Sequence, residues 1–220
     1  MKKLLVFSSG TATGGGSGFR YLAENCHTGV LKAEIVAVVT NHPKGGVCRH
    51  AQEIGIPVYH PQGKWDAEQY QMLCSRLQPD LVALSGWLKF VVGIKDIPVI
   101  NIHPGRLPET AGLHGLAVHH RSLELHQKDP TFTTTTAVTM HFVPYQEGVD
   151  RATYDTGQIF FEYPVAVRSS DTAESLAARV NEYEHGWQAY ITNLVLSGKI
   201  NWNPVSQLLI VPRDYQFLPQ

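Results

Sequence analysis

The feature that most limits the possible folds is a regular alternation of short apolar runs with amphipathic stretches over residues 3–103. Several of the apolar runs contain almost no polar residue, which is typical of strands covered on both faces of a sheet. The alternation predicts βαβ units and a mostly parallel sheet. The predicted strands are 3–7, 34–40, 57–60, 80–86 and 99–103, and the amphipathic stretches between them are 19–26, 46–55 and 67–77.

The pattern changes after residue 103. A helical segment is expected near 115–127, and two β-rich runs at 131–143 and 158–167 predict an antiparallel pair joined by a polar loop. Apolar residues recur every three or four positions across 171–197, which predicts a long amphipathic helix with Ser170 and Asp171 as candidate caps. We therefore expect an α/β fold, a Rossmann-like three-layer sandwich with a mostly parallel central sheet, an antiparallel C-terminal strand pair and a long helix.

Composition narrows the class of ligand. Of 220 residues, 18 are Lys or Arg and 19 are Asp or Glu, with no long run of one sign. Such a balance lacks the basic surface that binds nucleic acids or anionic membranes. We expect small-molecule substrates, with no nucleic-acid or membrane partner. The sequence predicts one domain over residues 1–200 and a tail, residues 201–220, to which it assigns no role.

The location follows from what the sequence lacks. The apolar run near the N-terminus is too short for a signal peptide, and no later stretch is long enough to span a membrane. Cys26, Cys48 and Cys74 are odd in number and form no CxxC pattern, which favours reduced thiols over disulfides or a zinc site. A cytoplasmic protein is expected.

A glycine-rich segment, SSGTATGGGSGF at residues 8–19, lies between the first predicted strand and the first predicted helix. Unhindered backbone amides beside a helix N-terminus can bind an anion, so the segment indicates a phosphate site. It matches neither the dinucleotide fingerprint, because Phe19 stands at the last glycine position, nor the GK[ST] ending of a Walker motif. A plain flexible turn is the alternative.

The stretch NIHPGRLPETAGLH, residues 101–114, begins at the end of a predicted parallel strand, where the ligand crevice of such sheets lies. Asn101 and His103 are two positions apart and share one face of the strand, so an amide and an imidazole could converge on a developing oxyanion. The alternative is that both are satisfied structural groups at a strand end.

Several motifs occur together in a fixed order: SGWLKFV, NIHPGRLP, GLH, HFV, YDTGQI and NEYEH. With the glycine loop, they make residues 3–200 resemble the folate-dependent formyltransferase family. The resemblance implies transfer of a formyl group from 10-formyltetrahydrofolate, as co-substrate, to the amine of glycinamide ribonucleotide in de novo purine synthesis, without a metal.

The resemblance also implies three groups of site residues. Asn101, His103 and Asp155 fall on the catalytic amide, imidazole and carboxylate, and Asp155 is expected to hold His103 protonated. The substrate-binding positions are Gly14, Gly15, Gly16, Ser17, Gly18, Pro104, Asn181 and Glu184. The positions on the wall that holds the pterin ring are Trp87, Leu88, Lys89, Phe90, Val91 and Val92. Trp87 could stack on the pterin or fill the core.

The chain departs from the family pattern at three places. Gly18 replaces a usual asparagine, and Gly105 and Arg106 replace a usual Ser-Leu pair, so that Arg106 could bind a substrate anion or point to solvent. The loop at 144–155 is extended and also offers Glu147 and Asp150 as partners for His103. Asp155 is preferred because Gly157 and the apolar run after it should fix it at the start of the next strand.

The remaining histidines do not have metal-binding spacing. His119, His120 and His126 are expected on the surface or on a helix face. His114 and His141 either support the catalytic residues or are structural.

Three other functions stay open. The chain could formylate a different amine, such as a nucleotide-linked amino sugar, or it could pass the formyl group to water as a 10-formyltetrahydrofolate hydrolase. Hydrolase relatives carry an extra N-terminal regulatory domain, and this chain begins at its first predicted strand, which counts against that function. A non-catalytic ligand-binding relative is the third. The sequence does not predict an oligomeric state.

Overall fold

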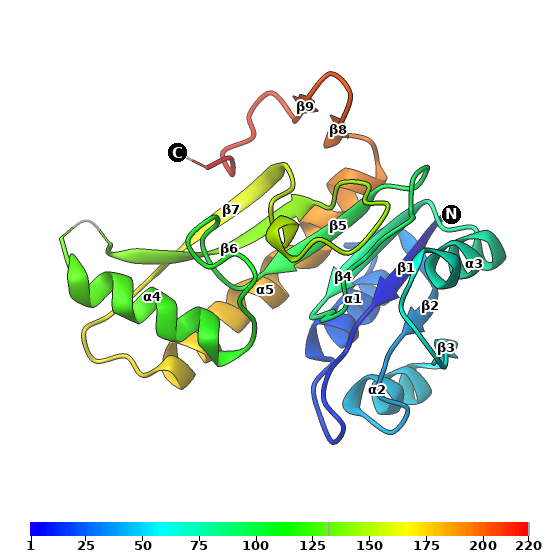
Figure 1. Ribbon diagram of the computed structural model, residues 1–220, viewed down its shortest axis with the longest axis horizontal. Helices are drawn as coiled ribbons and strands as arrows, with labels where there is room; N and C mark the ends of the chain where they lie inside the picture. The colour runs from blue at the N-terminus through cyan, green and yellow to red at the C-terminus, as the bar shows by residue number, and fades with distance from the viewer. Residues whose placement is uncertain (132, 220) are drawn as a thin grey trace.

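A computed structural model describes residues 1–131 and 133–219. The described residues form one seven-stranded sheet in the order β3-β2-β1-β4-β5-β6-β7, which Figure 1 shows side by side. The strands β1 to β5 pair in parallel, and β6 and β7 join antiparallel. The strands are β1 (Lys2–Phe7), β2 (Ala33–Val39), β3 (Val58–Tyr59), β4 (Leu81–Ser85), β5 (Val99–His103), β6 (Thr135–Phe142) and β7 (Ile159–Ala166).

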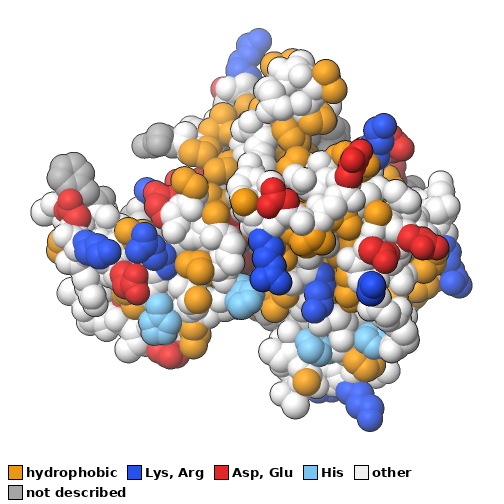
Figure 2. All heavy atoms as spheres, viewed as in Figure 1, with side chains coloured by type: hydrophobic (Ala, Val, Ile, Leu, Met, Phe, Trp, Pro, Cys, Tyr) orange, Lys and Arg blue, Asp and Glu red, His pale blue; other side chains and the backbone are white. Residues whose placement is uncertain are grey.

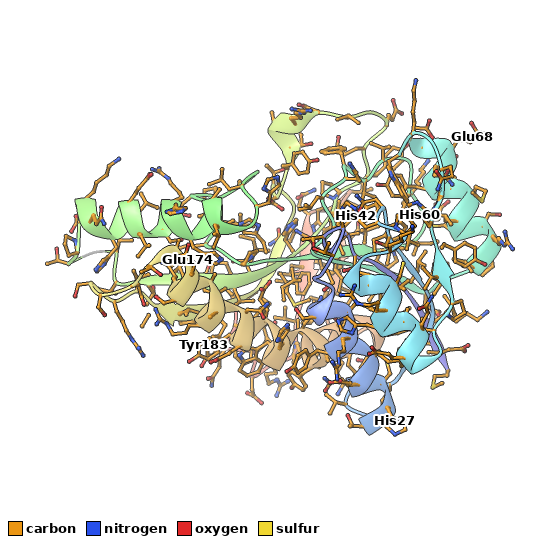
Figure 3. The ribbon with its side chains drawn as sticks, turned by 90° about the horizontal axis from the view of Figure 1, so that it is seen from below. His27, His42, His60, Glu68, Glu174 and Tyr183 are labelled. Atoms are coloured by element: carbon orange, nitrogen blue, oxygen red, sulfur yellow. The ribbon has the colours of Figure 1, made fainter. Side chains whose placement is uncertain are left out.

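The sheet has an apolar cluster on each face. Successive residues of a strand point to opposite sides, so each central strand contributes to both clusters. Leu4 and Val6 of β1 belong to one apolar cluster, and Leu5 and Phe7 belong to the other. The helices are α1 (Ser17–Thr28), α2 (Gly46–Ile54), α3 (Ala67–Leu77), α4 (Leu116–Lys128) and α5 (Ala173–Leu196). Residues of α1, α2 and α5 pack into the first cluster and residues of α3 into the second, and Figure 3 shows α1 and α5 on the opposite side of the sheet from α3. The predicted α/β Rossmann-like sandwich is confirmed.

The antiparallel pair and the long helix are also confirmed. Strands β6 and β7 pair antiparallel, with Thr139 opposite Glu162. Phe132, which belongs to the predicted run 131–143, lies outside the described residues. The cap of α5 differs from the expectation. Thr172 is the cap, because its hydroxyl accepts the Ser175 N–H while the Ser175 hydroxyl accepts the Thr172 N–H. Asp171 instead accepts from the Ser175 hydroxyl and pairs with Arg179.

Residues after α5 form a hairpin of β8 (Asn201–Asn203) and β9 (Leu208–Ile210) and then run along the outer strand β7. The Tyr215 hydroxyl donates to the Phe160 carbonyl at 2.8 Å, and the Glu162 N–H donates to the Phe217 carbonyl at 2.7 Å. The segment therefore covers backbone groups that an edge strand would otherwise expose. Figure 2 shows hydrophobic side chains gathered over it at the top of the molecule.

The longest helix of the described chain, α5, carries charged and polar side chains along its length. Among residues 1–131 and 133–219, no helix is long and apolar enough to cross a membrane.

Candidate active site

The end of β5 carries the amide and the imidazole that the sequence singled out. Asn101 is half-buried and His103 is 4% exposed. The Asn101 side-chain N–H group donates to Asp155 Oδ1 at 3.1 Å and also lies 3.1 Å from Nε2 of His141, which is opposite Asn101 in the ladder between β5 and β6. His141 Nδ1 lies 3.1 Å from the Phe142 carbonyl oxygen, which can only accept a hydrogen bond. His141 therefore supports the site directly.

Asp155 reaches this cluster from the loop before β7, rather than from the start of the strand as the sequence suggested. Its backbone has a left-handed φ of 55°, a conformation that Asp tolerates better than most residues. Its Oδ2 accepts the Gly112 N–H at 3.0 Å and lies 3.6 Å from His103 Nδ1. Hydrogen bonds to strand and loop, rather than secondary structure, fix this carboxylate.

The charges at the site follow from burial and from these partners. Burial pushes the pKa of Asp155 upward, but His141 at 3.4 Å, the nearby His103 and the Gly112 N–H outweigh it, so the pKa lies below its usual value. For His103, burial lowers the pKa to about 4, and the attraction of Asp155 does not offset it. Burial therefore opposes the expected protonation of His103 by Asp155, and this balance favours a neutral imidazole beside an ionised carboxylate near pH 7.

Glu147 and Asp150, the other acids of the extended loop, are exposed. Asp150 accepts the Ala152 N–H and begins a short 3₁₀ helix, η1 (Arg151–Thr153). Of the three acids, Asp155 is the one that the structure places beside His103.

The glycine-rich loop ends in the N-terminus of α1. Helix α1 begins at Ser17 after Gly16, whose φ is 85°, and the described residues supply no side-chain cap there. Its first N–H groups are therefore available to an anion. Ser17 Oγ lies 3.1 Å from His185 Nε2 on α5. Gly18 packs against Ser85, so that a side-chain carbon at 18 would meet the serine hydroxyl, which would have to turn away.

A cavity of about 710 Å³ joins this loop to the end of β5. Asn181 and Glu184 line it from α5, where the Asn181 amide donates to Glu184 at 3.4 Å, and burial raises the pKa of Glu184 to about 7. The other predicted substrate positions on its wall are Gly15, Gly16, Ser17, Gly18 and Pro104. Gly14 instead uses its carbonyl to accept the N–H groups of Thr11 and Gly46.

A second cavity, of about 60 Å³, lies on the other side of Asn101. Of the predicted pterin wall, Trp87, Lys89, Phe90 and Val91 line it. Leu88 faces the larger cavity and is 48% exposed, and Val92 is buried in the apolar cluster around α3. Trp87 also belongs to that core, since its indole N–H donates to the Tyr70 hydroxyl at 3.1 Å and its ring meets Phe7 edge-on.

The two cavities share a boundary. Asn101, Asp155, Trp87 and Tyr154 line both of them. Two ligands bound in these cavities would therefore meet beside the amide and the carboxylate, an arrangement suited to moving a group from one ligand to the other.

Arg106 lies elsewhere than the sequence suggested, and His119 lies on a helix face that is buried. Arg106 turns toward the sheet, where it donates to Thr135 at 3.0 Å and approaches Glu162 at 3.5 Å, so it neither faces a substrate nor points freely to solvent. His119 lies on the buried face of α4, so of the expected surface or helix-face position the helix face applies; it is 4% exposed, and burial lowers its pKa to about 4.

The other histidines have mixed positions. His120 is exposed, His126 Nδ1 lies 2.7 Å from the Thr133 carbonyl, and His114 is exposed on the wall of the larger cavity. Within the described ranges, no group of three or more His, Cys, Asp or Glu side chains could hold a metal ion.

Three residues at the site were missed from the sequence. Thr110 contacts His103, His185 contacts Ser17, and Tyr154 lies between the cavities with its ring edge-on to Phe90. His185 stands in NEYEH beside the assigned Glu184, which was a usable signal. The sequence carried no signal for Thr110, because only the turn of the loop after β5 brings it against His103.

The fold and the two adjoining cavities at the carboxyl end of a parallel sheet fit a group-transfer enzyme. The sequence model of the formyl transferase family matches residues 2–194, and the chain belongs to this family.

Curated relatives and solved structures of the same class are similar over most of the chain. Phosphoribosylglycinamide formyltransferase, chloroplastic, of Arabidopsis thaliana is 32% identical over 214 residues, which cover 91% of this chain and 68% of that protein. The protein of the same name from Vigna unguiculata is 31% identical, covering 97% and 67%. The structure of phosphoribosylglycinamide formyltransferase from Anaplasma phagocytophilum superposes with a TM-score of 0.78 at 26% identity, covering 98% and 97%.

Proposed function

We propose that this chain transfers the formyl group of 10-formyltetrahydrofolate to the amine of glycinamide ribonucleotide, a step of de novo purine synthesis. The relatives that are 31–32% identical are named phosphoribosylglycinamide formyltransferase. The observation that carries the proposal is the common boundary of the two cavities, where Asn101 and Asp155 line both of them. A formyl donor in one cavity and an amine in the other would react at that boundary.

The larger cavity suits the ribonucleotide. The phosphate would bind the N–H groups at the start of α1 and the Ser17 hydroxyl, because a helix N-terminus favours an anion. Glu184 and Asn181 would accept and donate hydrogen bonds to the ribose hydroxyls. The pterin would bind at the smaller cavity against the 87–91 segment, whose wall would have to open because about 60 Å³ is too small for a bicyclic ring. No metal takes part in the proposed reaction.

The residues at the boundary would handle charge and protons. Attack of the amine on the formyl carbon places a negative charge on the formyl oxygen. One N–H of Asn101 would stay on Asp155, and the other would leave His141 for this oxygen, a type of contact worth roughly 3 to 4 kcal/mol in favourable sites. His103 and Asp155 would move the proton from the amine toward the departing folate nitrogen.

The location and the domain division belong to the same proposal. Cys26, Cys48 and Cys74 are free thiols, which fits the proposed cytoplasmic location. Residues 1–200 would carry the whole formyltransferase site, with the tail packed on β7 and without a part in the chemistry. The substrates are small molecules, and no nucleic acid or membrane is needed.

Initial rates with four acceptors test the proposal. Purified protein and 10-formyltetrahydrofolate are mixed with glycinamide ribonucleotide, with unphosphorylated glycinamide riboside, with a nucleotide-linked amino sugar, or with no amine. We expect tetrahydrofolate to form rapidly with the ribonucleotide alone. A rate independent of any amine would identify a hydrolase, and preference for the sugar would identify another acceptor. Tight folate binding without turnover would identify a non-catalytic relative.

A further inference from the structure

Thr110 is buried beneath the catalytic imidazole. Thr110 is 1% exposed, and its hydroxyl oxygen lies 2.9 Å from His103 Nε2. The same hydroxyl donates to the Arg106 carbonyl at 2.7 Å. A hydroxyl has one proton and a carbonyl can only accept, so once that proton is on Arg106, the Thr110 oxygen can only accept from His103.

We propose that Thr110 is a positioning residue that holds His103 in the tautomer protonated at Nε2, so that the unprotonated Nδ1 beside Asp155 receives the proton of the attacking amine. The inference rests on the proposed formyl transfer. It goes beyond that function by assigning the atom that takes the proton and the residue that selects it.

The surroundings of Nδ1 suit a proton acceptor. It lies 3.6 Å from Asp155 Oδ2, too far for a hydrogen bond, so two lone pairs face each other across a gap that a shared proton or an N–H group would bridge. The titratable groups that act on His103 are Asp155, which favours its charged form, and His141 and His119, which disfavour it. A carboxylate that is already ionised is ready to pair with the imidazolium as soon as it forms.

The backbone that carries Thr110 is held on both sides. The Thr139 hydroxyl donates to the Gly105 carbonyl at 2.8 Å, and a side-chain carbon at 105 would collide with the Thr110 hydroxyl and with Val118. The Arg106 side chain is tied to Thr135 and Glu162 on the sheet. Gly105 thus makes the space that lets Thr110 reach His103.

The proton balance closes over one turnover. The amine nitrogen bonds to the formyl carbon while the carbonyl π electrons move to oxygen, and the resulting ammonium gives its proton to Nδ1 of His103. The imidazolium, paired with Asp155, then returns this proton to N10 of the folate as the C–N10 bond breaks and the oxyanion re-forms the carbonyl. His103 ends neutral, with Thr110 still accepting from Nε2.

Two variants separate the hydroxyl from the shape of the side chain. Thr110→Val keeps the branched shape and removes the acceptor, whereas Thr110→Ser keeps the hydroxyl. We expect Thr110→Val to lower kcat about tenfold or more, with both KM values changed less than about threefold. Thr110→Ser should keep most of the wild-type kcat. Thermal unfolding of each variant checks that the fold is intact. A folded Thr110→Val enzyme with the wild-type kcat would overturn the inference.

A second measurement does not need activity. In wild-type protein with ¹⁵N-labelled histidine, the two ring nitrogens of His103, assigned by their loss in His103→Asn, should show a protonated Nε2 and an unprotonated Nδ1 at pH 7. A protonated Nδ1 would overturn the inference even if Thr110→Val failed to fold. Lack of formyl transfer by the wild type would instead refute the proposed function, while the tautomer result would stand by itself.

Discussion

The side-chain amide of Asn101 donates to the carboxylate of Asp155 across 3.1 Å. Asn101 belongs to β5 and Asp155 to the loop before β7, so this hydrogen bond closes the wall between the two cavities. Because Gly112 holds the second carboxylate oxygen at 3.0 Å, Asp155 is fixed from both sides. The site thus has a rigid amide and carboxylate pair although one member is on a loop.

The Asn101→Ala variant should lose turnover and keep both ligands. The amide would act on the oxyanion, which exists only in the transition state, so we expect kcat to fall by about 10²- to 10³-fold with little change in either KM. Steady-state kinetics with each substrate varied separately measures the effect. His103→Ala should behave in the same way. Near-normal turnover in either variant would remove that residue from the catalytic set.

Two acids on the same loop give a matched pair of variants. Asp155→Asn should lower kcat by orders of magnitude, whereas Asp150→Asn, which removes a cap from η1, should change it little. The acid limb of the pH–rate profile should also move to lower pH in Asp155→Asn, because loss of the negative charge lowers the pKa of His103 further below about 4. If Asp150→Asn were the inactive variant, the catalytic carboxylate would be misassigned.

The glycine loop should govern binding of the phosphorylated substrate. Gly16→Val places a side chain where φ is 85° and where Val47 is already packed, so we expect KM for the ribonucleotide to rise far more than KM for the folate. Gly29→Ala is the control, since Gly29 has a φ of 80° at the other end of α1 and open space around it. A rise limited to the folate KM would mean that the loop binds the other ligand.

Glu184 should give the ribonucleotide KM a pH dependence near neutrality. Burial raises the pKa of this carboxyl to about 7, so it is largely neutral below that pH and charged above it. A carboxylate accepts hydrogen bonds from hydroxyls better than a neutral acid does, and KM should fall as pH rises from 6 to 8. Glu184→Gln should abolish this change, whereas Glu174→Gln, near the start of the same helix and marked in Figure 3, should leave it intact. A KM that varies equally in both variants would exclude Glu184.

The sequence predicted the parts of the site that depend on local pattern. Strand alternation placed Asn101 and His103 on one face, and the D-x-G motif identified Asp155. It could not predict that His103 is neutral, because that depends on how deeply the loop of Thr110 and helix α4 bury the imidazole. Arg106 was misjudged for a similar reason, since its partner Glu162 is distant in the chain and becomes a neighbour only when β7 pairs with β6.

For the helix boundaries too, local pattern predicted some features and tertiary contacts decided the others. The apolar periodicity predicted α5, but three polar residues in a row competed for its cap, and only side-chain geometry selected Thr172 over Ser170 and Asp171. The packing of Tyr215 and Phe217 on β7 had no periodic signal, because it consists of single contacts from an irregular segment.

The central claim is that a formyl group passes between two ligands that meet at Asn101 and Asp155, and its destination can be followed directly. Enzyme in excess over 10-formyltetrahydrofolate labelled with ¹³C in the formyl group is mixed with glycinamide ribonucleotide, and the product is read by NMR after one turnover. We expect all of the label on the amine of the ribonucleotide, with none released without it. Label that appears as formate at the same rate with and without the ribonucleotide would contradict the account.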